Sequence, residues 1–409
     1  MLVGMREFDV VVVGAGAAGL SLTRGLAEAN VRGADIADIA LVEPPPGAPR
    51  SPVRTWCFWE RGGGPWDPVL AARWERLAVI GPDGRHRASS AAPFVYKMLR
   101  STDVEEYVRS GLDGRVAQIS AVVNGIEDGA ERAVVRAVDA NGEPIEIGAR
   151  WVFDSRPPTS LPPAGTTLFQ HFRGWFLRTD TDAFTPHSAT LMDLRTPQPG
   201  NGVGFGYVLP FSVRAALVEY TEFTREILDD AGYEAALSDY TGRVLGLKDF
   251  TVTSTEQGVI PMTDARFRTR AGRRVFRIGA AGGATRPSTG YTFSGIQRQT
   301  AAVVDALTRG GTPVPPVPHR RRHLAMDAVL LRALDTGRLD GADFFARLFH
   351  RTPLPDVLDF LDGRSTLLRE LALGATTPLL PMSATTVEQA WRALVRRSRR
   401  AGVRVKSRG

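Results

Sequence analysis

The first forty residues alternate between apolar runs and turn residues in a regular order. Residues 8–13 form an apolar, β-branched run interrupted only by Asp9, and the glycine-rich turn GAGAAG follows it. Residues 20–29 have a helical pattern, and residues 36–42 form a second apolar run that ends in Glu43. The order of strand, tight turn, helix and strand predicts the first β-α-β unit of a doubly wound sheet.

The middle of the chain has the pattern of strands. Residues 117–153 alternate strand-like patches with Gly and Asn turns, which predicts a small antiparallel sheet. Residues 166–250 hold further strand candidates, notably HFRGWFLRT, SATLMDLR and GFGYVLPFSVRAALVEYTEFT. A last short strand is expected at 274–278, and after the linker GGTPVPPVPH the periodicity is helical to about residue 392.

Three glycines lie in the turn between the first strand and the first helix. Gly14, Gly16 and Gly19 have the spacing G-x-G-x-x-G, and Glu43 ends the next strand. Glycines permit a tight turn and close backbone approach, the helix N-terminus attracts a pyrophosphate, and the carboxylate accepts hydrogen bonds from ribose hydroxyls. An acid at this position predicts an unphosphorylated ribose, as in FAD or NAD.

A second glycine-rich stretch favours FAD over NAD. The sequence GAAGGATRPSTGYTFSG follows the last strand candidate and precedes a helical pattern. Two-part flavoproteins often hold the flavin end of FAD with such an element, so we expect Gly279, Gly282 and Gly290 to contribute to the cofactor site. A helix N-terminus aimed at the flavin ring would stabilise the negative charge of reduced flavin.

Nine stretches that span most of the chain carry a resemblance to a known family: FDVVVVGAGAAGL, RTWCFWE, VFDSRP, QHFRGWFLRT, TLMDLRT, GYVLPFSVRAALVEYTEFT, EQGVIPM, GAAGGATRPSTGYTFSGI and FFARLFHRTPLPDVLDFLDG. They resemble the FAD-dependent lycopene cyclases, within the flavoprotein monooxygenase-like folds. Two features depart from these patterns. Tyr220 stands where the family often has a second acid, and Ala280 and Ala281 stand where many related flavoproteins have an aspartate.

The resemblance implies a lycopene β-cyclase of carotenoid biosynthesis, an intramolecular lyase or isomerase. Such an enzyme protonates the linear ψ-end groups of lycopene or a related linear carotenoid and closes them to β-rings, giving γ-carotene and β-carotene. The reaction has no net redox change, yet it uses reduced FAD, with NADH or NADPH as the reductant. The alternative is a redox enzyme of the same fold, such as a hydroxylase or an isoprenoid reductase.

The stretch ALVEYTEFT places two glutamates in an apolar strand candidate. Alternate residues of a strand share a face, so Glu219 lies with Leu217 and Phe223, whereas Glu222 points to the opposite face. An apolar pocket raises the pKa of a carboxyl and keeps its proton on. Because the resemblance aligns Glu219 with the family's essential carboxyl, Glu219 is the predicted proton donor and Glu222 a solvated charge.

Several candidates remain open for the other roles at this site. Glu219 could instead be a buried acid paired with Arg173 or Arg214. The base that removes the last proton could be Asp193, Glu256 or the carboxylate of Glu219, and His171 is expected to be structural. Aromatic faces would stabilise the cation, and the candidates are Trp56, Phe58, Trp59, Phe172, Trp175, Phe176, Phe205, Tyr207, Tyr291 and Phe293.

Composition narrows the partners. The net charge is +7, and the segment 391–409 holds eight basic residues and no acid, so the basicity belongs to this end. Because no recognition motif accompanies it, we expect no nucleic-acid partner. Cys57 is the single cysteine, and one cysteine does not provide the ligand set of a cysteine-based metal site. No metal is therefore expected. The absence of a long apolar run or signal peptide predicts a protein that is soluble or peripheral to a membrane. Because the carotenoid that the resemblance implies dissolves in lipid, we expect a cytoplasmic protein, peripheral on the inner face of the cell membrane.

These observations predict an α/β fold of four parts. A Rossmann-like FAD-binding domain would span 5–158 and 268–310. A β-rich substrate domain would be inserted at 159–267. A helical C-terminal part would occupy 311–390, and a basic tail 391–409. Apolar helical positions such as Phe344, Phe345, Leu348, Phe349, Leu358 and Leu361 would face either the membrane or the protein core.

Overall fold

The computed structural model describes residues 5–34, 36, 38–48, 52–112, 114, 116–376 and 381–392. The strands are β1 (Arg6–Val13), β2 (Ile39–Glu43), β3 (Thr55–Arg61), β4 (Ala72–Trp74), β5 (Arg76–Ile80), β6 (His86–Ser90), β7 (Phe94–Arg100), β8 (Val116–Glu127), β9 (Ala133–Asp139), β10 (Pro144–Asp154), β11 (Thr167–Thr179), β12 (Ser188–Asp193), β13 (Val203–Ser212), β14 (Ala215–Thr224), β15 (Phe250–Thr263) and β16 (Val275–Arg277). The helices are α1 (Ala17–Val31), α2 (Ser101–Ser110), α3 (Asp230–Asp239), α4 (Phe293–Thr308), α5 (Arg321–Asp335), α6 (Gly341–Arg351), α7 (Leu354–Leu361) and α8 (Leu367–Ala375). Residues 381–392 are also helical, and short turns of helix occur at η1 (Asp67–Val69), η2 (Tyr240–Val244) and η3 (Gly279–Gly282).

The first sheet has parallel strands in the order β8, β2, β1, β10 and β16. Helix α1 connects β1 to β2, so the predicted β-α-β unit and the α/β fold class are confirmed. The antiparallel pairing predicted between residues 117 and 153 is present as β8, β9 and β10, but it is not a separate sheet. Because β8 and β10 are 12 and 11 residues long, each also pairs with a parallel neighbour.

The second sheet has seven strands in the order β15, β11, β14, β13, β12, β5 and β6. Its last two strands, β5 and β6, precede the predicted insert at 159–267 in the sequence. The chain therefore contributes to the second sheet before β8, β10 and β16 complete the first. A third sheet, β3-β7-β4, is short, and β3 meets β15 through two hydrogen bonds from Thr55 to Glu256.

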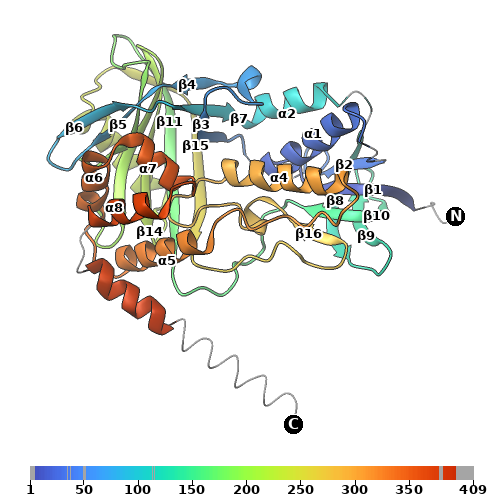
Figure 1. Ribbon diagram of the computed structural model, residues 1–409. Helices are drawn as coiled ribbons and strands as arrows, with labels where there is room; N and C mark the ends of the chain where they lie inside the picture. The colour runs from blue at the N-terminus through green and yellow to red at the C-terminus, as the bar shows by residue number, and fades with distance from the viewer. Residues whose placement is uncertain are drawn as a thin grey trace.

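Helices cover both faces of the second sheet. One face packs on α5, α6, α7 and the third sheet in a single apolar cluster, and the other face packs on α3 and η2. At the opposite end of the molecule, α1 and α4 lie together beside the first sheet, as Figure 1 shows. Of the apolar helical residues predicted above, Phe344, Phe345, Leu348, Phe349 and Leu358 are buried in the first of these clusters and Leu361 packs against it, so they belong to the core.

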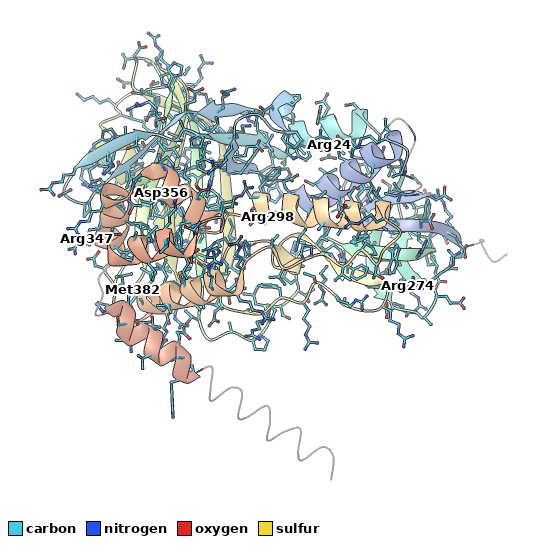
Figure 2. The ribbon with its side chains drawn as sticks, viewed as in Figure 1. Arg24, Arg274, Arg298, Arg347, Asp356 and Met382 are labelled. Atoms are coloured by element: carbon cyan, nitrogen blue, oxygen red, sulfur yellow. The ribbon has the colours of Figure 1, made fainter. Side chains whose placement is uncertain are left out.

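Ion pairs tie the C-terminal helices to the rest of the molecule. Figure 2 shows Arg298 between the helical end, marked by Arg347 and Met382, and the end built on the first sheet. Arg298 of α4 binds Asp362, which follows α7, at 2.8 Å. The C-terminal part therefore packs on the second sheet and is also joined to α4, which lies beside the first sheet.

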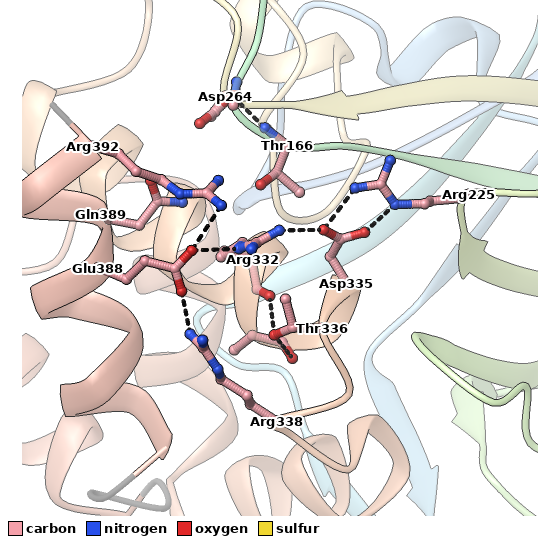
Figure 3. A network of polar contacts seen from close by, with 12 residues as sticks. Thr166, Arg225, Asp264, Arg332, Asp335, Thr336, Arg338, Glu388, Gln389 and Arg392 are labelled. Atoms are coloured by element: carbon pink, nitrogen blue, oxygen red, sulfur yellow. Dashed lines mark hydrogen bonds and ion pairs between the residues drawn. The ribbon is translucent and has the colours of Figure 1, made fainter. Parts of the chain in front are cut away.

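The helix at 381–392 is held by a chain of charges. Glu388 binds Arg332 of α5 at 3.0 Å, Arg332 binds Asp335 at 3.0 Å, and Asp335 binds Arg225 just after β14, as Figure 3 shows. The described helices include none long and apolar enough to cross a membrane. Of the predicted basic tail, residues 393–409 lie outside the described residues.

Candidate active site

The first glycine turn leaves its backbone open at one place. Gly14 has φ +96°, and a Cβ on Gly19 would lie 1.8 Å from the carbonyl oxygen of Gly14, so both positions require glycine. The Ser155 hydroxyl, just after the end of β10, donates to the carbonyl oxygen of Val13 at 2.8 Å and so holds the turn in place. A Cβ on Gly16 would meet no atom within 4 Å, and Gly16 caps α1 with no side-chain hydrogen bond. This uncapped helix N-terminus has the room and the amides that a pyrophosphate needs.

Glu43 lies where the sequence places it, buried at the end of β2. Its carboxylate forms an ion pair with Arg109 at the end of α2, and Arg109 also binds Glu105 at 2.8 Å. The arginine therefore orients the acid at the strand end. A contact from Glu43 to a ribose stays a prediction.

The second glycine element divides between two places. Gly279 has φ +66°, and a Cβ there would lie 2.8 Å from the Cβ of Ala18, so η3 packs directly on the start of α1. Gly282 is close-packed as well, because its Cβ would lie 2.4 Å from the carbonyl oxygen of Arg277. The structure thus brings Gly279 to the first glycine turn.

Gly290 contacts the second sheet instead. It has φ +71°, and a Cβ there would lie 2.0 Å from Oε1 of Gln170 on β11. This oxygen is buried and has no hydrogen-bond partner among the described residues. A buried acceptor of this kind suits a bound group that donates a hydrogen bond, and the glycines and Gln170 together fit an extended dinucleotide that runs from the first sheet to the second.

Four residues form a row across the second sheet. Tyr207 of β13 pairs with Glu219 of β14, Glu219 with Gly174 of β11, and Gly174 with Glu256 of β15. A Cβ on Gly174 would lie 2.7 Å from Cγ of Glu219 and 3.5 Å from Cγ of Glu256. The missing side chain lets the two glutamates meet over the strand between them, and their carboxyl groups hydrogen-bond each other.

Burial and proximity favour a state in which one carboxyl of the pair is protonated over a state in which both are charged. Glu219 is 7% exposed, and desolvation, together with the charge and hydrogen bond of Glu256, raises its pKa well above the usual value. Desolvation also raises the pKa of Glu256, but hydrogen bonds from the Thr55 hydroxyl (2.7 Å) and amide (3.2 Å) oppose that rise. We therefore assign the proton to Glu219, which donates to the Glu256 carboxylate.

Neutral groups lie on the Glu219 side of the pair. The Tyr96 hydroxyl lies 2.7 Å from that of Tyr207 and 2.9 Å from that of Tyr291. Desolvation raises the pKa of Cys57 on β3 to about 12, so its thiol stays protonated. Trp59 meets Tyr291 edge to face with ring centroids 4.6 Å apart. Aromatic and unionised side chains next to an acid can stabilise a cation without trapping it.

The predicted alternation of ALVEYTEFT is confirmed, but the prediction for Glu222 is wrong. Leu217 and Phe223 lie in the cluster on the Glu219 side, and Val218 and Tyr220 lie in the opposite cluster. Glu222 is only 8% exposed, because α3 covers the face that the sequence leaves open. The Tyr220 hydroxyl donates to its carboxylate at 2.8 Å, and burial raises the pKa of Glu222.

The structure does not support the arginine pairings proposed for Glu219. Arg173 binds Asp230 and donates to Gln257 at 2.9 Å, and Arg214 binds Asp182 at 2.6 Å. A buried carboxyl next to a fixed cation would have a lowered pKa. The charged neighbour of Glu219 is instead a second carboxyl group, that of Glu256.

Two other candidates lie on the α3 side of the sheet. Asp193 is fully buried, bonded to Arg195 at 2.6 Å and to the Tyr240 hydroxyl at 3.2 Å, so its lone pairs are already used. Both ring nitrogens of His171 are hydrogen-bonded, to Tyr233 and Thr224, at 2.7 Å each. This confirms the prediction that His171 has a structural role. Of the proposed bases, Glu256 is the one that the structure brings to Glu219.

Sequence reasoning missed the role of Gly174 and the phenol of Tyr96. A glycine within HFRGWFLRT is a signal for close approach, because glycine weakens a strand unless something occupies the space of its side chain. The predicted aromatic set also divides: Trp59, Tyr207 and Tyr291 lie on the Glu219 side, and Trp175 lies on the α3 side.

The fold is that of the flavoprotein monooxygenases and reductases. Similar solved structures include p-nitrophenol 4-monooxygenase from Pseudomonas putida DLL-E4, at 16% identity and a TM-score of 0.64 over 88% of this chain and 100% of that chain. A geranylgeranyl bacteriochlorophyll reductase-like protein from Thermoplasma acidophilum has 12% identity and a TM-score of 0.66 over 93% and 99%. A flavoprotein/dehydrogenase from Cytophaga hutchinsonii has 12% identity and a TM-score of 0.62 over 95% and 100%.

A model of one family matches nearly the whole chain. The family is described as lycopene cyclase protein, and the match covers residues 9–387. The chain therefore belongs to the lycopene cyclase family, as its sequence predicts. No curated protein matches the chain.

Protonated Glu219 has a consequence for stability. Above a pH of about 4.5 the unfolded chain releases this proton and the folded chain retains it, so the free energy of unfolding should fall as pH rises toward the raised pKa of Glu219. Glu219→Gln should weaken this dependence and raise the melting temperature at pH 9 by about 1 °C per kcal/mol, since the unfolding entropy grows with chain length. Calorimetry of the FAD-free protein between pH 6 and 9 measures both; an unchanged slope would contradict a protonated Glu219.

Proposed function

We propose that the protein is a lycopene β-cyclase. The observation that carries the proposal is a buried carboxyl, Glu219, next to a second carboxyl and among aromatic side chains, in a chain of the lycopene cyclase family; desolvation and the second carboxyl raise its pKa. Protonation of an isolated alkene needs an acid held away from water, and this side of the second sheet offers one.

FAD is the proposed cofactor, since the similar folds are flavoproteins and the glycine turns fit a dinucleotide. Gly14, Gly16 and Gly19 would hold the pyrophosphate and Glu43 the ribose. The second glycine element would hold the flavin end, through Gly279, Gly282 and Gly290. When bound in its reduced form, with NADH or NADPH as the proposed reductant, the flavin supplies negative charge near the substrate cation and is not consumed.

The proposed chemistry is a proton exchange on a hydrocarbon. The Glu219 hydroxyl donates its proton to the terminal double bond of a ψ-end, the resulting tertiary cation is attacked by the next double bond within reach, and a six-membered ring closes. Loss of a ring proton to water, which carries it to the solvent, then forms the β-ring double bond. One proton enters and one leaves for each ring, so the product is an isomer of the substrate.

The test is direct conversion in the absence of oxygen. The FAD-loaded protein, reduced with NADH or NADPH and mixed with lycopene in lipid vesicles, should form γ-carotene and β-carotene, with deuterium in each ring when the buffer is D₂O. If lycopene persists while the flavin is bound and reduced, the cyclase proposal fails. A hydroxylated product under oxygen, or a saturated one, would favour the redox alternative.

A membrane surface is the proposed location, on the inner face of the cell membrane, because a linear carotenoid dissolves in lipid. Helix α8 supports this: it buries Glu370, which binds Arg322 at 2.9 Å and His323 at 2.7 Å, and it exposes leucines on its outer side. Leu368 is 80% exposed, and Leu367 and Leu371 exceed half. A helix that turns its glutamate inward and its leucines outward suits an apolar surface.

Charge on this outer face should weaken membrane contact. The double substitution Leu368→Glu and Leu371→Glu should lower vesicle binding roughly 10- to 100-fold, since burial of each leucine contributes about 1.5–3 kcal/mol when complete. Co-sedimentation with vesicles of phosphatidylethanolamine and phosphatidylglycerol measures the change. Val31→Glu, at the equally exposed end of α1, is the matched control and should bind as the wild type. Equal binding of all three proteins would remove α8 from the proposed surface.

A further inference from the structure

The second carboxyl of the pair occupies a different environment from the first. Glu219 lies on an inner strand, whereas Glu256 lies on β15, the edge strand of the sheet. A cleft of about 400 Å³ opens at this edge, lined by Pro52, Val53, Arg173, Trp175, Glu234, Thr255, Glu256 and Gln257. Glu256 therefore lines this cleft, and its carboxyl group meets the buried acid.

Glu256 is also held in one orientation. Its two carboxylate oxygens accept from the hydroxyl and the amide of Thr55, at 2.7 and 3.2 Å, and its carboxyl group meets Glu219 over Gly174. Fixed donors on one side and a carboxyl on the other leave it able to accept and pass on a proton without moving far.

We propose that Glu256 is a positioning residue that keeps Glu219 protonated and renews its proton from the cleft. The inference rests on the proposed cyclase function and deepens it. After Glu219 gives its proton to the substrate, two adjacent carboxylates remain. A hydronium ion in the cleft gives a proton to Glu256, and Glu256 passes it to Glu219, which restores one neutral acid and one carboxylate. The reaction releases one proton from the ring for each it consumes, so charge balances.

The charged and titratable groups that face the pair come from several elements. Around the buried acid they are Cys57 on β3, Tyr96 on β7, Tyr207 on β13 and Tyr291 before α4, and Arg54 lies beside Glu256. Arg173 of β11 and Glu234 of α3 line the cleft next to Glu256. The thiol and the phenols have raised pKa values because they are desolvated, so they stay neutral in the working range. A change in this range is therefore assigned to the carboxyl pair.

Glu256→Gln should separate the first proton from its renewal. The first ring should form with a burst of about one ring per enzyme, because Glu219 begins protonated, and steady turnover should then fall roughly 100-fold. Removal of the neighbouring charge should also move the alkaline limb of the rate profile to lower pH. Glu256→Asp should restore part of the steady rate. Turnover and pH profile equal to the wild type, or no rescue by aspartate, would overturn the proposal.

Glu222→Gln is the matched control, since Glu222 is a second buried glutamate on β14 that faces α3. Its pH profile should equal that of the wild type. Infrared spectra of the FAD-loaded protein without substrate read the proton independently of cyclisation. A protonated-carboxyl band at neutral pH should vanish in Glu219→Gln and shift in Glu256→Gln. If the band behaves so but no lycopene is cyclised, the proposed function fails while the shared proton stands; a band insensitive to Glu256 overturns the shared proton.

Discussion

Glu219→Gln is expected to abolish ring formation while FAD remains bound. The amide has the shape of the acid and can donate to Glu256, but it has no acidic proton for an alkene, so the rate should fall at least ~10³-fold, within the range that general acids contribute. Conversion of lycopene by the reduced, FAD-loaded variant, followed by pigment chromatography, measures the loss. The flavin absorption spectrum measures cofactor retention in the same sample.

Two comparisons make this result specific. Glu222→Gln changes another buried glutamate of the same strand, and it should keep most of the activity because its carboxyl faces α3. Glu219→Asp keeps an acid but withdraws it from Glu256 by one methylene, so intermediate activity is expected. Undiminished ring formation by Glu219→Gln would assign the proton donor to another residue.

Local patterns carried most of what the sequence predicted. The first strand, glycine turn and helix depend on residues near one another in the chain, and so does the alternation that separates Glu219 from Glu222. The G-x-G-x-x-G turn was predictable because its requirement is local as well: Gly19 touches Gly14 within the same turn.

Long-range pairing decided the rest. Glu219 meets Glu256 only because β11 lies between β14 and β15 and places Gly174 opposite both residues, an order that no local pattern contains. The burial of Glu222 likewise depends on α3, a helix that follows β14 in the sequence and folds back against it. Periodicity assigns residues to faces, but the cover of each face comes from elements elsewhere in the chain.

The carboxyl pair also clarifies why Tyr220 takes the place of a second acid. The neighbour of Glu219 in the sequence points to the α3 side, so an acid at position 220 would lie on the wrong face to share its proton. Glu256 supplies a second carboxyl from two strands away and on the correct face. The departure from the family pattern therefore leaves the proposed chemistry intact.

Gly16→Val is expected to remove FAD without unfolding the protein. Gly16 has extended backbone, φ −82° and ψ −172°, which valine adopts readily, and its Cβ would meet no atom within 4 Å. The same open space is where the pyrophosphate must approach the N-terminus of α1, so the side chain should block it. Affinity for FAD should fall at least about 100-fold, since hydrogen bonds to charged groups contribute about 1.5–3 kcal/mol each.

Fluorescence titration with FAD measures the loss, and the melting temperature of the flavin-free proteins tests the fold, because bound FAD would itself stabilise the wild type. Gly200→Val is the matched control: Gly200 is exposed, and a Cβ there also meets no atom within 4 Å. That variant should bind FAD normally. If Gly16→Val binds FAD as tightly as the wild type, the pyrophosphate does not lie on this turn, and the α1 end of the first sheet loses its proposed role.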